Sequence, residues 1–487
     1  MSDKRLSLKE QTARGLLWGG FSNGIQQLLN LFFGIWLSRI LSVDDYGMIG
    51  ILTLFTLIAT TLQESGFTQA LANKDKTTHQ DFNAVFWCSS LIGITLYVIL
   101  FFLAPYIALF FETPELTKLS RFLFLGFLLA SFGTAHNAYL FKHLMVKERA
   151  ISMITGLVVS GIFGVTLAYK GYAYWGLATQ SIAYILVTNS LFWYFSKWRP
   201  TLQFNLSPVK ELLPFSSKIL VTKLFTHFNN HLFNVLLGKF YTKKDVGYFS
   251  QANKWNLMGS SVVTEMIQGV AQPVLRNVAD DKERQTRVFS KMLRFTSFVC
   301  FPALFGLAFI APEFIVIALT DKWLPSAFIL QILCIGGAFY PINNLFGNLI
   351  ISKNRTNAYM LNIIALGALQ LSTALILYPY GVKTMVIAFV AIHISWMFIW
   401  YSTARKSIHL TVKQLLIETI PYLITIVIAI AITHLTLYNI SNIYLLLVSK
   451  ILVTATLYIG LLFIVRASIL KESFDYIKSI FNKKHGK

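Results

Sequence analysis

Long apolar runs recur along the whole chain and are separated by short polar segments. Each run is long enough, at 1.5 Å per residue, to cross about 30 Å of hydrocarbon as a helix. The runs lie at about 15–38, 46–71, 83–110, 120–141, 151–169, 173–195, 212–238, 246–274, 290–311, 326–351, 358–378, 382–403, 417–437 and 443–465. The pattern therefore predicts an all-α integral membrane protein with about 14 transmembrane helices.

The composition agrees with a membrane protein. Of the 487 residues, 55% are hydrophobic and only 13% are charged, whereas about a quarter of the residues of a soluble domain are charged. The positive charge follows the connections between the spans. If the N-terminus is cytoplasmic, and charges at the ends of spans are counted with the adjoining loops, 29 of the 42 Lys and Arg residues fall in inner segments, nine in outer loops and four within spans. This bias predicts that both termini are cytoplasmic, and a charge spread over so many loops does not indicate nucleic-acid binding.

The first and seventh spans resemble each other at a shift of 200 residues. Asn30 aligns with Asn230, Asp45 with Asp245, and Gly47 with Gly247. The shift grows gradually to 210 later in the chain, which indicates a repeat of six spans. We therefore expect a six-helix bundle at 1–200, a second at 201–408, two additional transmembrane helices at 409–465 and a basic interfacial cytoplasmic tail at 466–487. Parallel repeats of this kind occur in transporters, whose substrate site lies at the interface between the repeats.

Polar side chains form a stripe along several of the predicted spans. A polar stripe is costly against lipid, so these faces are expected to line a hydrated cavity between the two bundles. Lys223 lies near the middle of the seventh span, where a charge is usually functional. The candidate substrate-binding residues are Lys223, Lys254, His227, His231, Asn230, Asn23, Gln27, Asn30 and Lys218.

Simpler interpretations of the same residues stay open. Lys218 and Lys254 lie where a lysine can extend its ammonium group to the membrane surface, and the two histidines can serve as hydrogen-bond partners between helices. Glu64 and Glu265 lie at nearly corresponding heights in the two halves. They are candidates for coupling transport to H⁺ or Na⁺, although hydrogen bonding between helices explains them equally well.

No motif for catalysis or for a cofactor is present. The sequence lacks an ATP-binding G-x-x-x-x-G-K-[ST] loop, an H-E-x-x-H metal motif, a paired-cysteine site and a G-x-S-x-G motif. We therefore expect no catalytic residue, no metal and no cofactor, which favours a transporter over an enzyme.

Several stretches resemble a known family. "FWYFSKWRPTLQFN", "FSSKILVTKLF" and "GKFYTKKDVGYFSQANKW" are similar to polysaccharide exporters of the Wzx type, which are related to MATE multidrug exporters and lipid II flippases. The resemblance implies a MATE-like bundle in the bacterial inner membrane. Its implied function is to move an undecaprenyl-pyrophosphate-linked oligosaccharide, for O-antigen, capsule or exopolysaccharide, to the periplasmic leaflet by alternating access. Many relatives have an arginine where this chain has Gln251, and Lys254 follows a turn later.

Two other functions stay open: export of drugs or other organic cations, and a membrane enzyme acting on polyprenyl-linked sugars. A cation exporter should carry carboxylates deep in its cavity, whereas the deepest charge here is that of Lys223. The expected partners are the bilayer, the lipid-linked oligosaccharide and a downstream polysaccharide polymerase, with the protein itself a monomer.

Overall fold

The computed structural model describes residues 8–465 except 75, 354 and 406, together with residues 467 and 469; some side chains within helices are outside the described set. The basic tail predicted at 466–487 lies almost wholly outside the described residues. Within the described ranges, every regular element is a helix. The prediction of an all-α membrane protein is confirmed.

The chain forms two compact units, Met1–Gly247 and Tyr248–Lys487, and each is described by itself. The division differs from the repeat boundary predicted at residue 200, because α9 packs against helices of the first unit; the boundary between the repeats stays a prediction. The first unit contains α1 (Leu8–Ile40), α2 (Val43–Glu64), α3 (Phe67–Asn73), α4 (His79–Phe110), α5 (Leu116–Ser131), α6 (Thr134–Lys142), α7 (Val146–Tyr169), α8 (Tyr174–Phe195), α9 (Ser207–Phe240) and the start of α10 (Lys243–Asn277).

Side-chain caps set the starts of two long helices in the first unit. Ser42 caps α2 and Thr78 caps α4, each in a capping box with an aspartate three residues later, Asp45 or Asp81. These boxes satisfy backbone N–H groups that have no partner within the helix. The break between α2 and α3 lies at Ser65 and Gly66, which both adopt left-handed backbone conformations (φ 47° and 69°). α2 and α3 therefore form one interrupted membrane segment.

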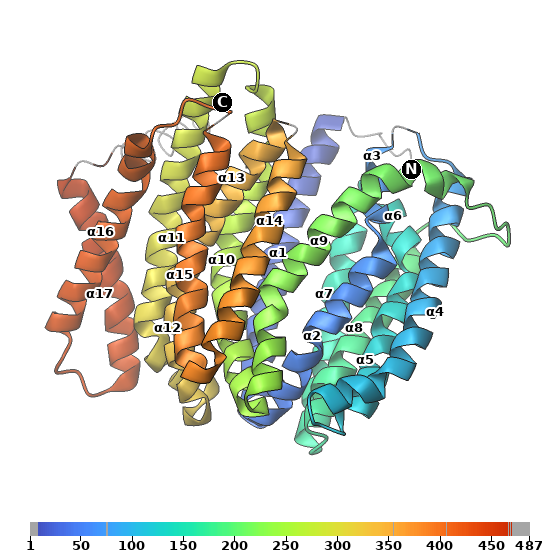
Figure 1. Cartoon of the computed structure of the whole chain (residues 1–487), viewed down its shortest axis with the longest axis horizontal. Helices are drawn as coiled ribbons and strands as arrows, with labels where there is room; N and C mark the ends of the chain where they lie inside the picture. The colour runs from blue at the N-terminus through green and yellow to red at the C-terminus, as the bar shows by residue number, and fades with distance from the viewer. Residues whose placement is uncertain are drawn as a thin grey trace, which may run out of the picture. The chain divides into compact units, whose positions relative to one another are not determined.

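Aromatic and aliphatic side chains form the core of the first unit. One cluster of buried residues joins α3, α4 and α6 to the segment after α8, and includes Phe67, Phe82, Phe86 and Trp198. α7 packs against α1 and α8, while α9 packs against α2, α3 and α4. Figure 1 shows α9 running obliquely along this group of helices. α9, which the predicted repeat aligns with α1, is thus part of the first unit.

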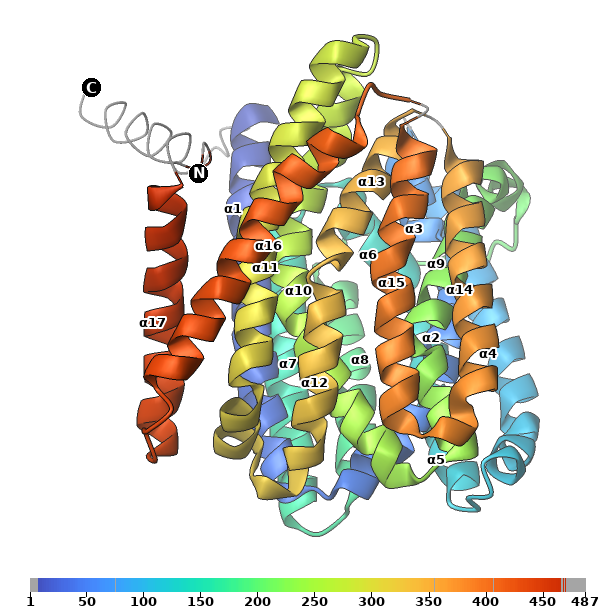
Figure 2. The ribbon, with the colours of Figure 1, turned by 60° about the vertical axis from the view of Figure 1, so that its left-hand side comes forward.

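The second unit is a group of long helices with few interruptions. It contains the rest of α10, α11 (Lys282–Leu319), η1 (Asp321–Trp323), α12 (Leu324–Gly337), α13 (Tyr340–Ser352), α14 (Thr356–Leu377), η2 (Tyr378–Tyr380), α15 (Val382–Ala404), α16 (Val412–Thr436) and α17 (Ile443–Ile464). α14 pairs with α15, and α16 and α17 form a helical hairpin that packs on α11. Figure 1 and Figure 2 show the two helices of the hairpin beside α11. The hairpin corresponds to the two additional helices that the sequence predicts after the repeats.

All fourteen predicted spans are helical, but not all of them are apolar enough to qualify as membrane spans by hydropathy. In the described part of the chain, nine helical segments do so, or ten if the bent pair α5–α6 is one span. α1, α8, α9 and α10, which are 33, 22, 34 and 35 residues long, do not qualify, because polar side chains lower their hydropathy. The fold is that of a multi-pass membrane protein, and the count of 14 crossings stays a prediction.

The starts of α2 and α10, which the predicted repeat aligns, share two details of local structure. Asp45 bonds to the backbone N–H and hydroxyl of Ser42, and Asp245 does the same with Thr242. Glycines follow both caps. A Cβ atom at Gly47 would lie 2.0 Å from the carbonyl oxygen of Lys243, and one at Gly247 would lie 2.2 Å from that of Val43. Each helix start therefore approaches the other through a glycine, and the residues concerned are equivalent in the repeat.

Candidate functional site

The structure pairs two predicted site residues from different helices. Lys223, at the middle of α9, donates a hydrogen bond from Nζ to Oε2 of Glu64, the last residue of α2, over 3.0 Å. Their side chains are 32% and 27% exposed, so the ion pair is neither fully buried nor freely solvated. From the sequence alone, Lys223 was expected to bind substrate and Glu64 to couple transport to an ion. The structure brings both groups to one point.

The other polar residues of α9 continue from this pair along the helix. His227 lies one turn after Lys223 and interacts electrostatically with both Lys223 and Glu64. His231 is a further turn along and half-buried, and among the described residues its Nδ1 has no hydrogen-bond partner. Asn230 is also half-buried. The amide of Asn234 donates to the carbonyl oxygen of Gly50 in α2 over 3.4 Å. The polar stripe of α9 thus lies along α2 in part, instead of facing only an open cavity.

The predicted residues of α1 differ in exposure. Asn23 and Asn30 are exposed within the protein chain, while Gln27 is half-buried. Gln26, on the same face, donates to the hydroxyl of Ser22 over 2.9 Å. The side chain of Lys218, which precedes Lys223 on α9, lies outside the described residues. The role of these positions as a cavity lining stays a prediction.

Lys254 and Glu265 belong to the second unit. Both lie in α10; the Lys254 ammonium group is 5.8 Å from the centroid of the Trp255 ring, and Glu265 is exposed within the chain. Gln251, which precedes Lys254 by three residues in α10, is buried.

A second ionic contact fixes the start of α9 to its neighbours. Lys74, directly after α3, binds Asp81 at 2.8 Å and Glu211 at 2.9 Å. These two hydrogen bonds, that with Asp81 first, raise the pKa of Lys74 above its ordinary value. Because Glu211 and Lys223 both belong to α9, the helix is held by ion pairs near its start and at its middle.

Two ion pairs in the second unit were not singled out from the sequence. Lys450 of α17 binds Glu313 of α11 at 2.6 Å, and each side chain is only 11% exposed. Arg294 of α11 donates to both carboxylate oxygens of Glu418 in α16, at 2.6 and 2.8 Å. Both pairs attach the C-terminal hairpin to α11. Each of these charges lies in or next to a predicted apolar run, which could have marked it as a candidate. The partners are 137 and 124 residues apart, however, so the sequence does not indicate which charges pair.

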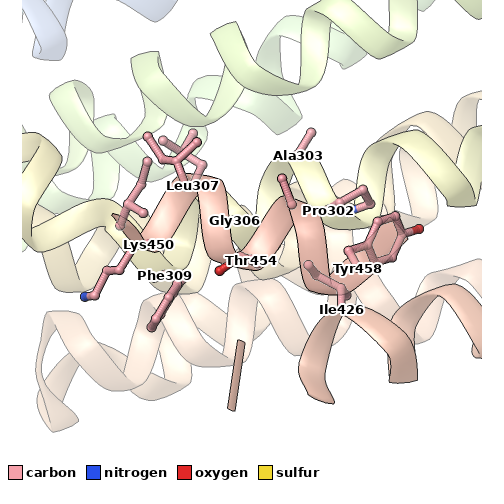
Figure 3. A pocket seen from close by; sticks show the side chains of 12 residues that line it. Pro302, Ala303, Gly306, Leu307, Phe309, Ile426, Lys450, Thr454 and Tyr458 are labelled. Carbon is pink, nitrogen blue, oxygen red and sulfur yellow. The ribbon is translucent and has the colours of Figure 1, made fainter. Parts of the chain in front are cut away.

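A cavity of about 380 Å³ lies between α11, α16 and α17. Its lining is mainly apolar and includes Ala303, Gly306 and Ile426, with Thr454 and Tyr458 among the polar members. Figure 3 shows Lys450 at one end of the lining side chains and Tyr458 at the other. The cavity belongs to the second unit, so it contains none of the residues of the Lys223–Glu64 pair.

Among the described residues, no group of three or more His, Cys, Asp or Glu residues could hold a metal ion. A helical membrane architecture with charges at the middle of its helices is typical of transport proteins. A family model described as "Polysaccharide biosynthesis protein" matches residues 36–328. The chain belongs to this family. The resemblance to polysaccharide exporters that the sequence motifs indicated is thereby confirmed.

Curated relatives share about a quarter of their residues with this chain. It is 27% identical to an uncharacterized membrane protein in the cps region of Klebsiella pneumoniae over 354 residues, and 26% identical to the lipopolysaccharide biosynthesis protein WzxC of Escherichia coli over 359 residues. Each match covers 72% of both chains. The teichuronic acid biosynthesis protein TuaB of Bacillus subtilis is 24% identical over 356 residues, covering 72% of this chain and 73% of that relative.

Solved structures show the same fold at low sequence identity. A lipid II flippase MurJ in an inward closed conformation matches with a TM-score of 0.77 and 16% identity, covering 93% of this chain and 100% of that one. An inward-facing MATE multidrug transporter matches with a TM-score of 0.64 and 16% identity, covering 78% and 94%. The MATE-like fold expected from the sequence is therefore confirmed. The family and the relatives above are named for polysaccharide production, and the two fold neighbours are a flippase and a transporter, which agrees with the expectation of a transporter and not an enzyme.

Proposed function

We propose that this protein is a flippase that moves an undecaprenyl-pyrophosphate-linked oligosaccharide from the cytoplasmic to the periplasmic leaflet of the bacterial inner membrane. Its product would serve the assembly of O-antigen, capsule or exopolysaccharide. The family and the names of its relatives support a role in polysaccharide production. The fold shared with a lipid II flippase supports translocation of a lipid-linked sugar.

The observation that carries the proposal is the Lys223–Glu64 ion pair. A lysine at the centre of a membrane helix is costly unless its charge is compensated. A partly exposed pair can exchange one partner for another, and the pyrophosphate of the substrate is an anion that can take the place of the Glu64 carboxylate at Lys223. His227, one turn away, can add a hydrogen bond to the same anion. Lys223 is thus the proposed phosphate ligand.

The exchange of partners also gives a route to ion coupling. When the pyrophosphate occupies Lys223, the Glu64 carboxylate loses its compensating charge and is then able to take up a proton or Na⁺. Releasing the substrate would restore the ion pair and expel the cation. Substrate and cation binding would therefore be linked through one group. Lys254 and Glu265 are proposed to play the matching part in the second repeat, on the evidence of the sequence alone.

The decisive experiment has a cellular and a reconstituted arm. Deleting the gene should cause a lipid-linked oligosaccharide to accumulate on the cytoplasmic face. The purified protein in sealed proteoliposomes should move that lipid between leaflets, and the Lys223→Ala variant should not. If no such lipid accumulates and the proteoliposomes export organic cations instead, the protein is a drug exporter. Turnover of the lipid in detergent would indicate the enzyme alternative.

A further inference from the structure

The segment between α8 and α9, residues 196–206, is held firmly against α4 although it forms no regular element. We name it the strap; it is the loop leading into α9 in Figure 1. Trp198 is its buried anchor, with a side chain packed among aromatic rings of α4 and α6. The centroid of its ring lies 5.0 Å from that of His136, 6.0 Å from that of Phe86 and 6.1 Å from that of Phe82.

Hydrogen bonds from α4 fix the backbone of the strap beyond Trp198. Asn83 is buried; its amide donates to the carbonyl oxygen of Gln203 over 2.7 Å, and its own oxygen accepts from the N–H of Thr201 at 2.8 Å. The indole N–H of Trp87 donates to the carbonyl oxygen of Thr201 over 2.8 Å. Ordering a loop costs conformational entropy, and these three hydrogen bonds offset part of that cost. They hold the strap in one conformation against α4.

The fixed strap presents apolar side chains outward. Leu202 is 81% exposed, Phe204 is 69% exposed and Leu206 is 40% exposed. Single exposed apolar residues are ordinary, but three within five residues of a segment held in place form a patch that another surface should cover. The Phe204 ring lies 4.6 Å from the Trp87 ring, which holds it at the edge of α4.

Basic residues flank the apolar patch on both sides. Lys197 and Arg199 precede it and Lys210 follows it, and all three are exposed. Within the part of the chain that the structure describes, none of these cations forms an ion pair: Arg199 donates to the carbonyl oxygens of Ser196 and Trp198. The neighbouring carboxylate of Glu211 is bound to Lys74. The patch therefore carries uncompensated positive charge.

We propose that the strap is a binding surface for anionic phospholipid in the leaflet at this end of the helices. Leu202, Phe204 and Leu206 would enter the boundary between headgroups and acyl chains, while the three cations bind lipid phosphates. Apolar burial combined with basic residues is the chemistry that binds an anionic membrane surface. Because the strap leads directly into α9, lipid bound there would fix the start of the helix that carries Lys223. Transport would then depend on anionic lipid.

The test uses the full-length protein with Cys88, Cys300 and Cys334 replaced, and one new cysteine carrying a fluorescent label. The label at F204C is compared in lipid nanodiscs with one at Ile99, on the exposed face of α4, and one at Glu283, an exposed residue in the first turn of α11. Quenching by brominated lipid reports contact with acyl chains, and quenching by iodide reports contact with water. The F204C label should behave like that at Ile99, and replacing zwitterionic lipid by phosphatidylglycerol should strengthen its lipid quenching several-fold.

Charge variants test the electrostatic part. Replacing Lys197, Arg199 and Lys210 by glutamine should remove the response to phosphatidylglycerol. The matched control replaces three exposed cations near the start of α11, Lys282, Arg284 and Lys291, and should retain the response. All six positions are exposed, so folding is expected to survive, and the elution volume in gel filtration verifies this.

Two outcomes would overturn the proposal. If the F204C label is quenched by iodide like that at Glu283 in every lipid, the strap faces water and its apolar patch does not bind lipid. A protein partner would then be the better explanation of the patch. If both charge variants lose the lipid response equally, the response belongs to the total charge of the protein and not to the strap. Neither outcome bears on Lys223, so failure here leaves the proposed flippase function standing.

Discussion

At the residue scale, the charge of Lys223 is already compensated by Glu64, and this alters what a substitution should do. Lys223→Ala should lower export by about tenfold or more, which corresponds to roughly 1.4 kcal/mol of lost stabilisation. Lys223→Arg should keep part of the activity, because the charge survives although the compact ammonium group does not. Export is measured in proteoliposomes at matched protein amounts, with Lys244, an exposed residue in the first turn of α10, changed to alanine as the control.

A swapped pair separates binding from folding. The double variant Lys223→Glu/Glu64→Lys can reform the ion pair with reversed positions, so it should recover the thermal stability that either single change loses. It should not recover full export, because the positive charge now extends from α2 and not from α9. Wild-type export by the swapped protein would show that the pair is only structural.

The coupling proposal is tested at the same pair. Export should respond to a proton or sodium gradient in the native protein, and Glu64→Gln should abolish that response because an amide cannot take up a proton or replace the carboxylate charge. Glu265→Gln should also weaken the response, because Glu265 is proposed to play the matching part in the second repeat. Transport that is unchanged when both gradients are collapsed in the native protein would favour movement driven by removal of the product.

At the scale of elements, the ion pair between α11 and α17 should stabilise the C-terminal hairpin only while both partners are present. Lys450→Met leaves the Glu313 carboxylate buried without a partner and should cost about 3–5 kcal/mol. The double variant Lys450→Met/Glu313→Leu should regain most of this loss, since apolar side chains can fill the same space. Thermal unfolding in detergent measures both.

An exposed ion pair provides the matched control for the hairpin. Glu115 lies 3.8 Å from Lys243 and its side chain is 54% exposed, so Glu115→Gln should change stability by no more than about 1 kcal/mol. A similar loss in Lys450→Met and Glu115→Gln would mean that burial does not determine the contribution of the α11–α17 pair.

The faces of α1 and α9 can be tested by cysteine accessibility. Cysteines at Asn30 and Asn230 should react with a water-soluble thiol reagent if these positions line a hydrated cavity. A cysteine at Trp36, whose side chain is 38% exposed on the apolar face of α1, should not react. Equal reactivity at all three positions would contradict the assignment of the polar stripes.

At the scale of the whole molecule, the helices were predictable because each is an autonomous apolar or amphipathic run. The limits of the prediction appear in α9. Its polar stripe was evident from helical spacing, but its partner Glu64 lies 159 residues away, and no periodicity connects two helices. The pairs of Lys450 and Arg294 were missed for the same reason. Periodicity shows which face of a helix is polar, whereas packing decides what that face meets.

The reciprocal glycines at the starts of α2 and α10 have the character of an isologous interface, the kind by which two identical subunits associate. Here both partners belong to residues 1–247 of one chain. Gly47 lies against Lys243 and Gly247 lies against Val43, so both close approaches set the distance between the starts of the same two helices. Gly47→Ala should increase that distance at a cost of about 1–3 kcal/mol, and thermal unfolding should show that Gly247→Ala then adds less than it costs alone. The chain would thus respond to mutation at this point as a homodimer does, with two equivalent positions that do not act independently.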